Sequence, residues 1–126
     1  MIEYLQVDDL DAIGKALIPG FTVRDWGMLE AAVARPAASA LGEDAYPTVH
    51  HKAAALLHSI VRNHALVDGN KRLGWAATLL FYGYNALWMP ELEHEQYEFV
   101  VSVANGTVFD GAEMAKTLHK WTIPLD

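Results

Sequence analysis

Apolar residues recur every three or four positions along most of this chain, and this spacing restricts it to helices that share a core. One stripe is formed by Leu73, Ala76, Ala77, Leu80, Phe81 and Tyr84. Another precedes it and is formed by Val49, Ala53, Leu56, Leu57 and Ile60. Each matches the core-facing side of an amphipathic helix. The sequence therefore predicts an all-α fold with two central helices, and no pattern indicates a sheet as the main architecture.

Capping residues and helix breakers divide the pattern into about six helices. Asp8 and Asp25 precede the apolar residues of the first two predicted helices, and their carboxylates can accept hydrogen bonds from free backbone N–H groups. Asp110, followed by Glu113, resembles a capping box at the start of the last helix. The segment 38–47 is predicted to be a loop, and the segment 86–89 is predicted to be extended.

The composition is that of a globular domain without covalent cross-links. The 126 residues are 52% hydrophobic and 20% charged, which predicts one domain spanning residues 1–126. Cysteine is absent from the sequence, which excludes thiol catalysis and fits a reducing cytoplasm. The first residues do not resemble a signal peptide, and no apolar run is long enough to span a bilayer. We therefore expect a cytoplasmic protein that does not associate with membranes.

The net charge of −7 argues against direct binding of nucleic acid, which requires many lysines and arginines facing phosphates. It does not exclude one nucleotide in a local basic pocket. The run Gly69, Asn70, Lys71 and Arg72 at the start of the second central helix is such a candidate. The first turn of a helix has free N–H groups and the positive end of the dipole, so it attracts anions. Two cations there are unfavourable unless an anion offsets them.

His64 and Asp68 precede this run and complete a set of groups suited to phosphate transfer. The imidazole of His64 is a natural general base, because its unperturbed pKa is near neutrality. The Asp68 carboxylate is a hard oxygen ligand of the kind that holds Mg²⁺ together with phosphates. A base, a metal carboxylate and a phosphate cradle therefore lie within nine residues, which predicts transfer of a nucleotide phosphate to a hydroxyl.

Other polar and aromatic residues have simpler interpretations. His50, His51 and His58 lack the spacing of three or four residues that brings two helical ligands to one metal, so we expect solvated or core-edge positions. The four tryptophans are interpreted as core and groove residues rather than as a base-stacking platform. A further apolar stripe is interpreted as core: Tyr97, Val100, Val101 and Ala104.

The run His-Ala-Leu-Val-Asp-Gly-Asn-Lys-Arg, residues 64–72, resembles the signature of the Fic/Doc family. The segments 24–36 and 42–47 resemble the upstream helix and the flap-side loop of that family, so the similarity covers nearly the whole chain. The compact length resembles the Doc branch, which contains the toxins of toxin–antitoxin pairs. This resemblance implies a compact, single-domain helical bundle with the active-site loop between two central helices.

The resemblance also implies roles for individual residues. His64 matches the catalytic histidine that activates the target hydroxyl, and Asp68 matches the carboxylate that binds Mg²⁺. Asn70 and Arg72 match residues that bind the phosphates of the nucleotide. Lys71 stands where the adenylylating branch has glycine, and a lysine there is associated in the Doc branch with transfer of the γ-phosphate.

By resemblance, the reaction is phosphorylation of a Thr or Ser hydroxyl by ATP. Trp75 supports this choice, because it stands where many adenylylating members have a second arginine. Elongation factor Tu is the expected protein target, and arrested translation is the expected outcome. Transfer of AMP is the alternative reaction, and a catalytically weakened binding module of a toxin–antitoxin complex is the alternative function.

Some positions depart from the family pattern. Ala65-Leu66 replaces the usual Pro-Phe pair, and Leu66 is expected to supply the apolar anchor below the loop with less volume. Leu73 replaces a small hydroxyl residue, and Gly14 stands near a position that often holds histidine. These changes bear on catalytic efficiency more than on the fold.

The resemblance further implies an antitoxin partner, whose C-terminal segment folds as a helix in a groove of the toxin. Helix-in-groove binding uses exposed apolar anchors. The segment containing Leu87, Trp88 and Met89 and the chain end near Trp121 carry more apolar bulk than a surface tail needs.

Overall fold

The computed structural model describes residues 1–125, apart from the side chain of Glu93, and within this range it contains six α-helices and one 3₁₀ turn, which together make up 60% of the chain. The helices are α1 (Val7–Leu17), α2 (Trp26–Ala34), α3 (Val49–Asn63), α4 (Asn70–Tyr84), α5 (Glu93–Ala104) and α6 (Gly111–Trp121). A 3₁₀ turn, Arg35–Ala37, follows α2. The predicted all-α fold is confirmed.

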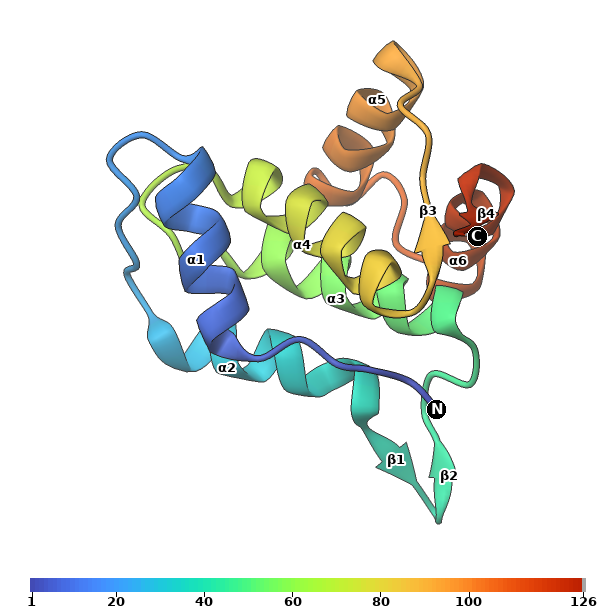
Figure 1. The fold of residues 1–126 in the computed structure, drawn as a ribbon. Coiled ribbons are helices and arrows are strands. Elements are labelled where there is room, and N and C mark those ends of the chain that lie inside the picture. Colours follow the sequence, from blue (N-terminus) through green and yellow to red (C-terminus); the bar gives the residue numbers. More distant parts are fainter. Residues whose placement is uncertain (126) are drawn as a thin grey trace.

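Helices α3 and α4 form the centre of the fold, as their apolar stripes predicted (Figure 1). Gly74 lets the two helices approach closely, because a Cβ at this position would lie 2.6 Å from Val61 Cγ1. The remaining helices pack around this pair. α2, α5 and α6 contact α3, and α1 crosses α4. One cluster of buried apolar side chains connects these elements.

The predicted helix starts are correct for two helices and wrong for a third. Asp25 caps α2 by accepting from Met28 N at 3.2 Å, and Asp110 caps α6 by accepting from Ala112 N at 2.9 Å. Asp8, however, lies inside the first turn of α1, whose N-cap is Gln6. The neighbouring Asp9 carboxylate accepts from Gln6 N at 2.7 Å and so stabilises that end. Because Asp8 and Asp9 are adjacent, the sequence does not show which of the two carboxylates stabilises the start of the helix.

The strands are short and pair locally. β1 (Ser39–Ala40) and β2 (Glu43–Asp44) form a hairpin within the predicted loop, and β3 (Leu87–Trp88) pairs antiparallel with β4 (Ile123–Pro124). Lys52 of α3 anchors the base of the hairpin. Its buried ammonium donates to the carbonyl oxygen of Tyr46 at 2.6 Å and to Asp44 Oδ2 at 3.2 Å. These acceptors compensate for the loss of water around the buried charge.

Two histidines connect α6 to the central helices. The rings of His50 on α3 and His119 on α6 stack with their centroids 4.1 Å apart. His50 Nδ1 lies 2.9 Å from the hydroxyl of Tyr82 on α4. Burial raises the pKa of the Tyr82 phenol, so the hydroxyl remains protonated and donates to His50. This part of the fold therefore depends on a neutral His50.

The close contact at Gly74 predicts opposite effects for two substitutions in α4. Gly74→Ala is expected to lower the free energy of unfolding by about 1–3 kcal/mol, because the new methyl group displaces Val61. Gly83→Ala has open space around it and is expected to raise the free energy of unfolding by about 0.5–1 kcal/mol through helix propensity. Urea unfolding of both variants measures the difference. Equal stabilities would contradict the proposed packing.

The His50 environment predicts a loss of stability in weak acid. Its pKa is lowered from 6.5 to about 4, chiefly because burial disfavours the charged ring, and also through repulsion from His119 and His51. Between these two values the unfolded chain binds more protons than the folded protein, so stability falls as the pH drops. The contribution is roughly 1 kcal/mol, because solvent partly screens the ring.

Thermal melts between about pH 7 and pH 5 test this linkage. His50→Gln removes the titrating group and is expected to flatten the pH dependence of Tm. His94→Gln, at an exposed position on α5, is the matched control and is expected to leave the dependence unchanged. Parallel profiles for the wild type and His50→Gln would show that His50 does not couple to folding.

Candidate active site

The candidate site is built on the loop between α3 and α4, and two unusual backbone conformations shape it. His64 ends α3 with φ 52° and ψ 46°, in the left-handed region. Gly69 begins α4 with φ 92° and ψ 14°, and its Cα faces Ile18, so a Cβ would lie 2.9 Å from Ile18 Cγ2. Non-glycine residues with positive φ are uncommon and cluster at functional sites. The loop thus turns the chain sharply and projects His64 outward, where it is exposed.

The segment after α1 holds this loop in place. The carbonyl oxygen of Ala65 accepts from Arg24 N at 2.7 Å and from Asp25 N at 3.1 Å, and Val67 N donates to Thr22 O at 3.1 Å. Segments distant in sequence therefore pair like two short antiparallel strands (Figure 1). The methyl side chain of Ala65 supplies little rigidity itself, but its carbonyl oxygen is held by two hydrogen bonds. Sequence reasoning missed this pairing, because irregular segments carry no periodic signal.

Leu66 is fully buried, which confirms its predicted role as the apolar anchor of the loop. Asn70 fixes the same residue through two backbone contacts. Its Oδ1 accepts from Leu66 N at 3.0 Å, and its Nδ2 donates to Leu66 O at 3.2 Å. The structure therefore shows Asn70 as a residue that positions the loop, and leaves one of its side-chain N–H groups for a phosphate.

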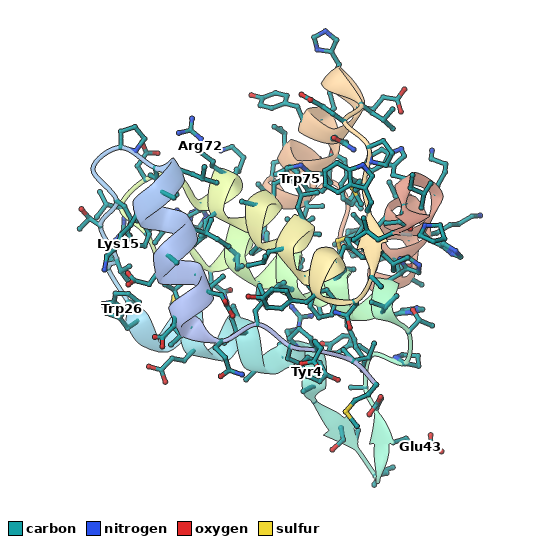
Figure 2. All side chains as sticks on the ribbon, viewed as in Figure 1. Tyr4, Lys15, Trp26, Glu43, Arg72 and Trp75 are labelled. Carbon is teal, nitrogen blue, oxygen red and sulfur yellow. The ribbon has the colours of Figure 1, made fainter. Side chains whose placement is uncertain are left out.

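The first turn of α4 has the features of an anion site. Its N-cap is Gly69, which has no side chain to satisfy the free N–H groups, whereas carboxylates cap α2 and α6. Lys71 and Arg72 are both exposed at this end. Arg72 Nη1 lies 3.4 Å from the Leu17 carbonyl oxygen at the end of α1, and Figure 2 shows its side chain extending from α4 beside α1. Uncapped N–H groups and two cations therefore converge.

A single groove of about 1120 Å³ contains these groups. It is lined at one end by the predicted site residues His64, Asp68, Gly69, Asn70, Lys71 and Arg72. The structure therefore brings all six together on one surface. The volume is slightly above that of ordinary ligand pockets, so the groove has room for a nucleotide and for part of a larger partner.

The other end of the groove is apolar and is lined by α4, α5 and the segment after α4. Tyr97, predicted to be core, is 67% exposed and lines the groove, together with the half-buried Val101. The prediction was wrong for these two because α5 has two apolar faces. Phe99 and Val103 on the other face fill the core. Apolar residues around most of a helix were the signal that it packs on both sides.

Of the predicted groove anchors, Trp88 and Met89 lie in this apolar end, whereas Leu87, which packs against the core, and Trp121 do not line the groove. Trp88 and Met89 line the groove, and Trp88 is 52% exposed. Trp75 of α4 faces the same space (Figure 2). Trp121, in contrast, is buried, with its ring edge-on to Phe99 at a centroid distance of 5.4 Å. It belongs to the core, and the prediction that it forms part of the groove was wrong.

The segment 42–47, expected as the flap-side loop, lies at the opposite end of α3 from His64. The fifteen residues of α3 separate them by about 22 Å, so this segment does not reach the loop between α3 and α4. The segment 22–25 lies there instead. Gly14, where the family often has histidine, is filled by the Phe21 ring, which overlaps the position of any Cβ. The aromatic ring thus takes the space of the missing side chain.

Comparison with known proteins agrees with this geometry. The profile described as the Fic/DOC family matches residues 4–82, which include the loop, the start of α4 and the segment that pairs with the loop. The chain belongs to the Fic/DOC family. Proteins of the Fic/DOC family generally transfer nucleotide or phosphate groups onto other proteins.

One relative is the protein named Toxin Doc of Mycolicibacterium smegmatis (strain ATCC 700084 / mc(2)155). It is 53% identical to this chain over 88 residues, which cover 69% of this chain and 68% of the relative. The resemblance to the Doc branch is therefore confirmed. No helix in the described part of the chain combines the length and apolarity needed to cross a membrane.

The residues of the site fit the nucleotide and metal that the family generally binds. Asp68 is exposed in the groove, and within residues 1–125 no lysine or arginine forms an ion pair with it. Its carboxylate oxygens are therefore free to act as ligands to Mg²⁺, which usually has one or two carboxylates and several phosphate or water oxygens. The uncapped turn and the two cations beside it suit a chain of phosphates.

The contacts of Asn70 predict a local effect on the loop. Asn70→Ala removes both hydrogen bonds to Leu66 and is expected to cost roughly 1–2 kcal/mol of local stability. Hydrogen exchange at the Leu66 amide is then expected to become faster. Lys71→Ala is the control, because the described part of the structure shows no hydrogen bond from the Lys71 side chain to the loop. Equal exchange in the two variants would contradict the positioning role.

Proposed function

We propose that this protein is a Doc-type toxin that phosphorylates a Thr or Ser hydroxyl of a protein target at the expense of ATP and Mg²⁺. The observation that carries the proposal is the convergence of His64, Asp68 and the uncapped first turn of α4 in one groove. A base, a metal ligand and an anion cradle are the groups that phosphoryl transfer requires. The family membership and the similarity to Toxin Doc support the same assignment.

His64 acts as the general base in this proposal. Its exposed ring removes the proton of the target hydroxyl, whose oxygen then bonds to the γ-phosphorus while the bond to the β,γ-bridging oxygen breaks and ADP leaves. Arg72 and the N–H groups of α4 hold the phosphate oxygens and stabilise their charge. Mg²⁺, when bound at Asp68, supplies further neutralisation of that charge.

Lys71 determines which phosphorus is attacked. In the proposal its ammonium fills part of the anion cradle, so that the γ-phosphate rather than the α-phosphate faces His64. Trp75 lies in the same groove at the position where adenylylating relatives have an arginine, and an indole offers no charge for a further phosphate. Both residues favour phosphorylation over AMP transfer.

Elongation factor Tu is the proposed target, with arrest of translation as the result. An antitoxin is the proposed partner, and its apolar helix occupies the end of the groove lined by Trp88, Tyr97 and Val101. The groove is continuous from this apolar end to His64. A helix bound there lies beside the catalytic groups and can block access of the target. We place the reaction in the cytoplasm, where such a target is found.

Incubation with elongation factor Tu, Mg²⁺ and ATP tests the reaction, with intact mass as the readout. Addition of one phosphate is expected for the wild type, and addition of AMP would establish the alternative reaction. His64→Ala and Asp68→Ala are expected to lower the rate by at least about 100-fold, because each removes a group that acts in the transfer. If the target is unmodified and wild type and His64→Ala arrest growth equally, the protein acts as a binding module.

Lys71→Gly tests the choice of phosphate. The substitution reopens the anion cradle, so the rate of γ-phosphate transfer is expected to fall and transfer of AMP becomes possible. Parallel assays with γ-labelled and α-labelled ATP distinguish the two reactions. An unchanged rate with γ-label alone would show that Lys71 does not determine the position of the nucleotide.

A further inference from the structure

A second cationic site lies outside the groove, around Arg35 at the junction of α2 and α3. Arg35 Nε donates to the Tyr46 hydroxyl at 2.7 Å. Its Nη1 donates to Ser59 Oγ at 2.9 Å and lies 3.0 Å from His58 Nδ1. Among residues 1–125, no Asp or Glu pairs with this guanidinium, and its Nη2 has no hydrogen-bond partner. The half-buried guanidinium of Arg35 therefore forms hydrogen bonds only with neutral groups of the described protein.

The hydrogen bonds around Arg35 leave this site rich in hydrogen-bond donors. A guanidinium cannot accept a hydrogen bond, so His58 Nδ1 must be the acceptor, and the proton of a neutral His58 ring lies on Nε2. His51 is arranged similarly. Thr48 Oγ1 accepts from His51 N at 3.1 Å and lies 2.6 Å from His51 Nδ1. When the Thr48 hydroxyl donates to Nδ1, the proton of a neutral His51 ring lies on Nε2.

These residues line one small pocket. Its volume is about 60 Å³, and its lining residues are Arg35, Tyr46, His51, Ala55, His58, Phe109, Gly111 and Met114. The lining side chains that can donate hydrogen bonds are the Arg35 guanidinium, the Tyr46 hydroxyl and the two histidine rings. Among the described side chains, no carboxylate lines the pocket, and Asp110, next to Gly111, uses its carboxylate to cap α6. The pocket therefore presents donors without a matching acceptor.

Burial and neighbouring positive charge disfavour a protonated His58 ring in this pocket. The pKa of His58 is lowered, first by burial and then by the positive charges of Arg35 and Arg62. Positive potential of this kind is relieved by an anion. The pocket shares no lining residue with the catalytic groove, so an anion bound here is separate from the nucleotide site.

We propose that this pocket binds a single phosphate group. Its volume suits one small oxyanion and is far below that of the pockets that hold larger ligands. Phosphate has three acceptor oxygens, whereas a carboxylate has two, and donors approach here from three different elements. The phosphate is either the free ion or a monoester that projects its phosphate into the pocket past the exposed ring of Phe109.

Nuclear magnetic resonance of the histidine side chains tests the proposal. On titration with inorganic phosphate, the ring signals of His51 and His58 are expected to shift and saturate, with a Kd of about 1 mM. These signals report on the pocket alone, because phosphate bound at the first turn of α4 is expected to move those of His64 instead. A parallel titration with phosphoserine shows whether the pocket also accepts a monoester. Saturation with either ligand supports the proposal.

A matched pair of variants identifies the site. His51→Leu removes one donor without touching the Arg35 hydrogen bonds, and is expected to weaken phosphate binding about tenfold. His94→Leu makes the same change at an exposed position on α5 and is expected to bind as the wild type does. The His58 ring signal reports binding in both variants, and thermal melts confirm that both fold.

Three results would overturn the proposal. The ring signals of His51 and His58 would remain unmoved by both phosphate ligands while that of His64 shifts. Alternatively, His51→Leu and His94→Leu would bind phosphate equally. The third result is saturation of the two signals by acetate at a lower concentration than by phosphate, which would identify a carboxylate site instead.

Discussion

The candidate active site depends on backbone pairing between the loop after α3 and the segment after α1. The Ala65 carbonyl accepts from two successive N–H groups, and Val67 N donates to Thr22 O. These bonds fix the residue that directly follows His64, whose own backbone is in the left-handed region. A strained conformation persists only where its surroundings determine it. Without this pairing, the imidazole and the first turn of α4 would have no defined separation.

Close packing of α4 against α1 and α3 fixes the position of the candidate anion site at the start of α4. Gly69 approaches Ile18, and Gly74 approaches Val61, so α4 is held against both α1 and α3 along its first half. Asn70 then connects α4 back to the loop through Leu66. The uncapped first turn of α4 and His64 therefore line the same groove. Preorganised donors of this kind stabilise charge without reorganising during the reaction.

The cationic site at Lys71 and Arg72 and the cationic site at Arg35 differ in what surrounds them. Lys71 and Arg72 are exposed at the mouth of a large groove with Asp68 beside them, an arrangement suited to phosphates bound together with a metal. Arg35 is half-buried in a small pocket without a carboxylate, an arrangement suited to one bare oxyanion. Solvent access and the presence of a metal ligand, rather than charge alone, distinguish the two environments.

The sequence by itself determined the six helices, because their apolar stripes and breakers are local signals, and it predicted the loop between α3 and α4 that carries the candidate site. Only the tertiary structure decided what faces the groove. Tyr97 and Val101 have the spacing of core residues, yet they line the groove, and Trp121 lies in the core. The partner of the loop, residues 22–25, was also unpredictable. Periodicity shows that a face is apolar, but only packing between distant segments determines whether that face meets the core or a partner.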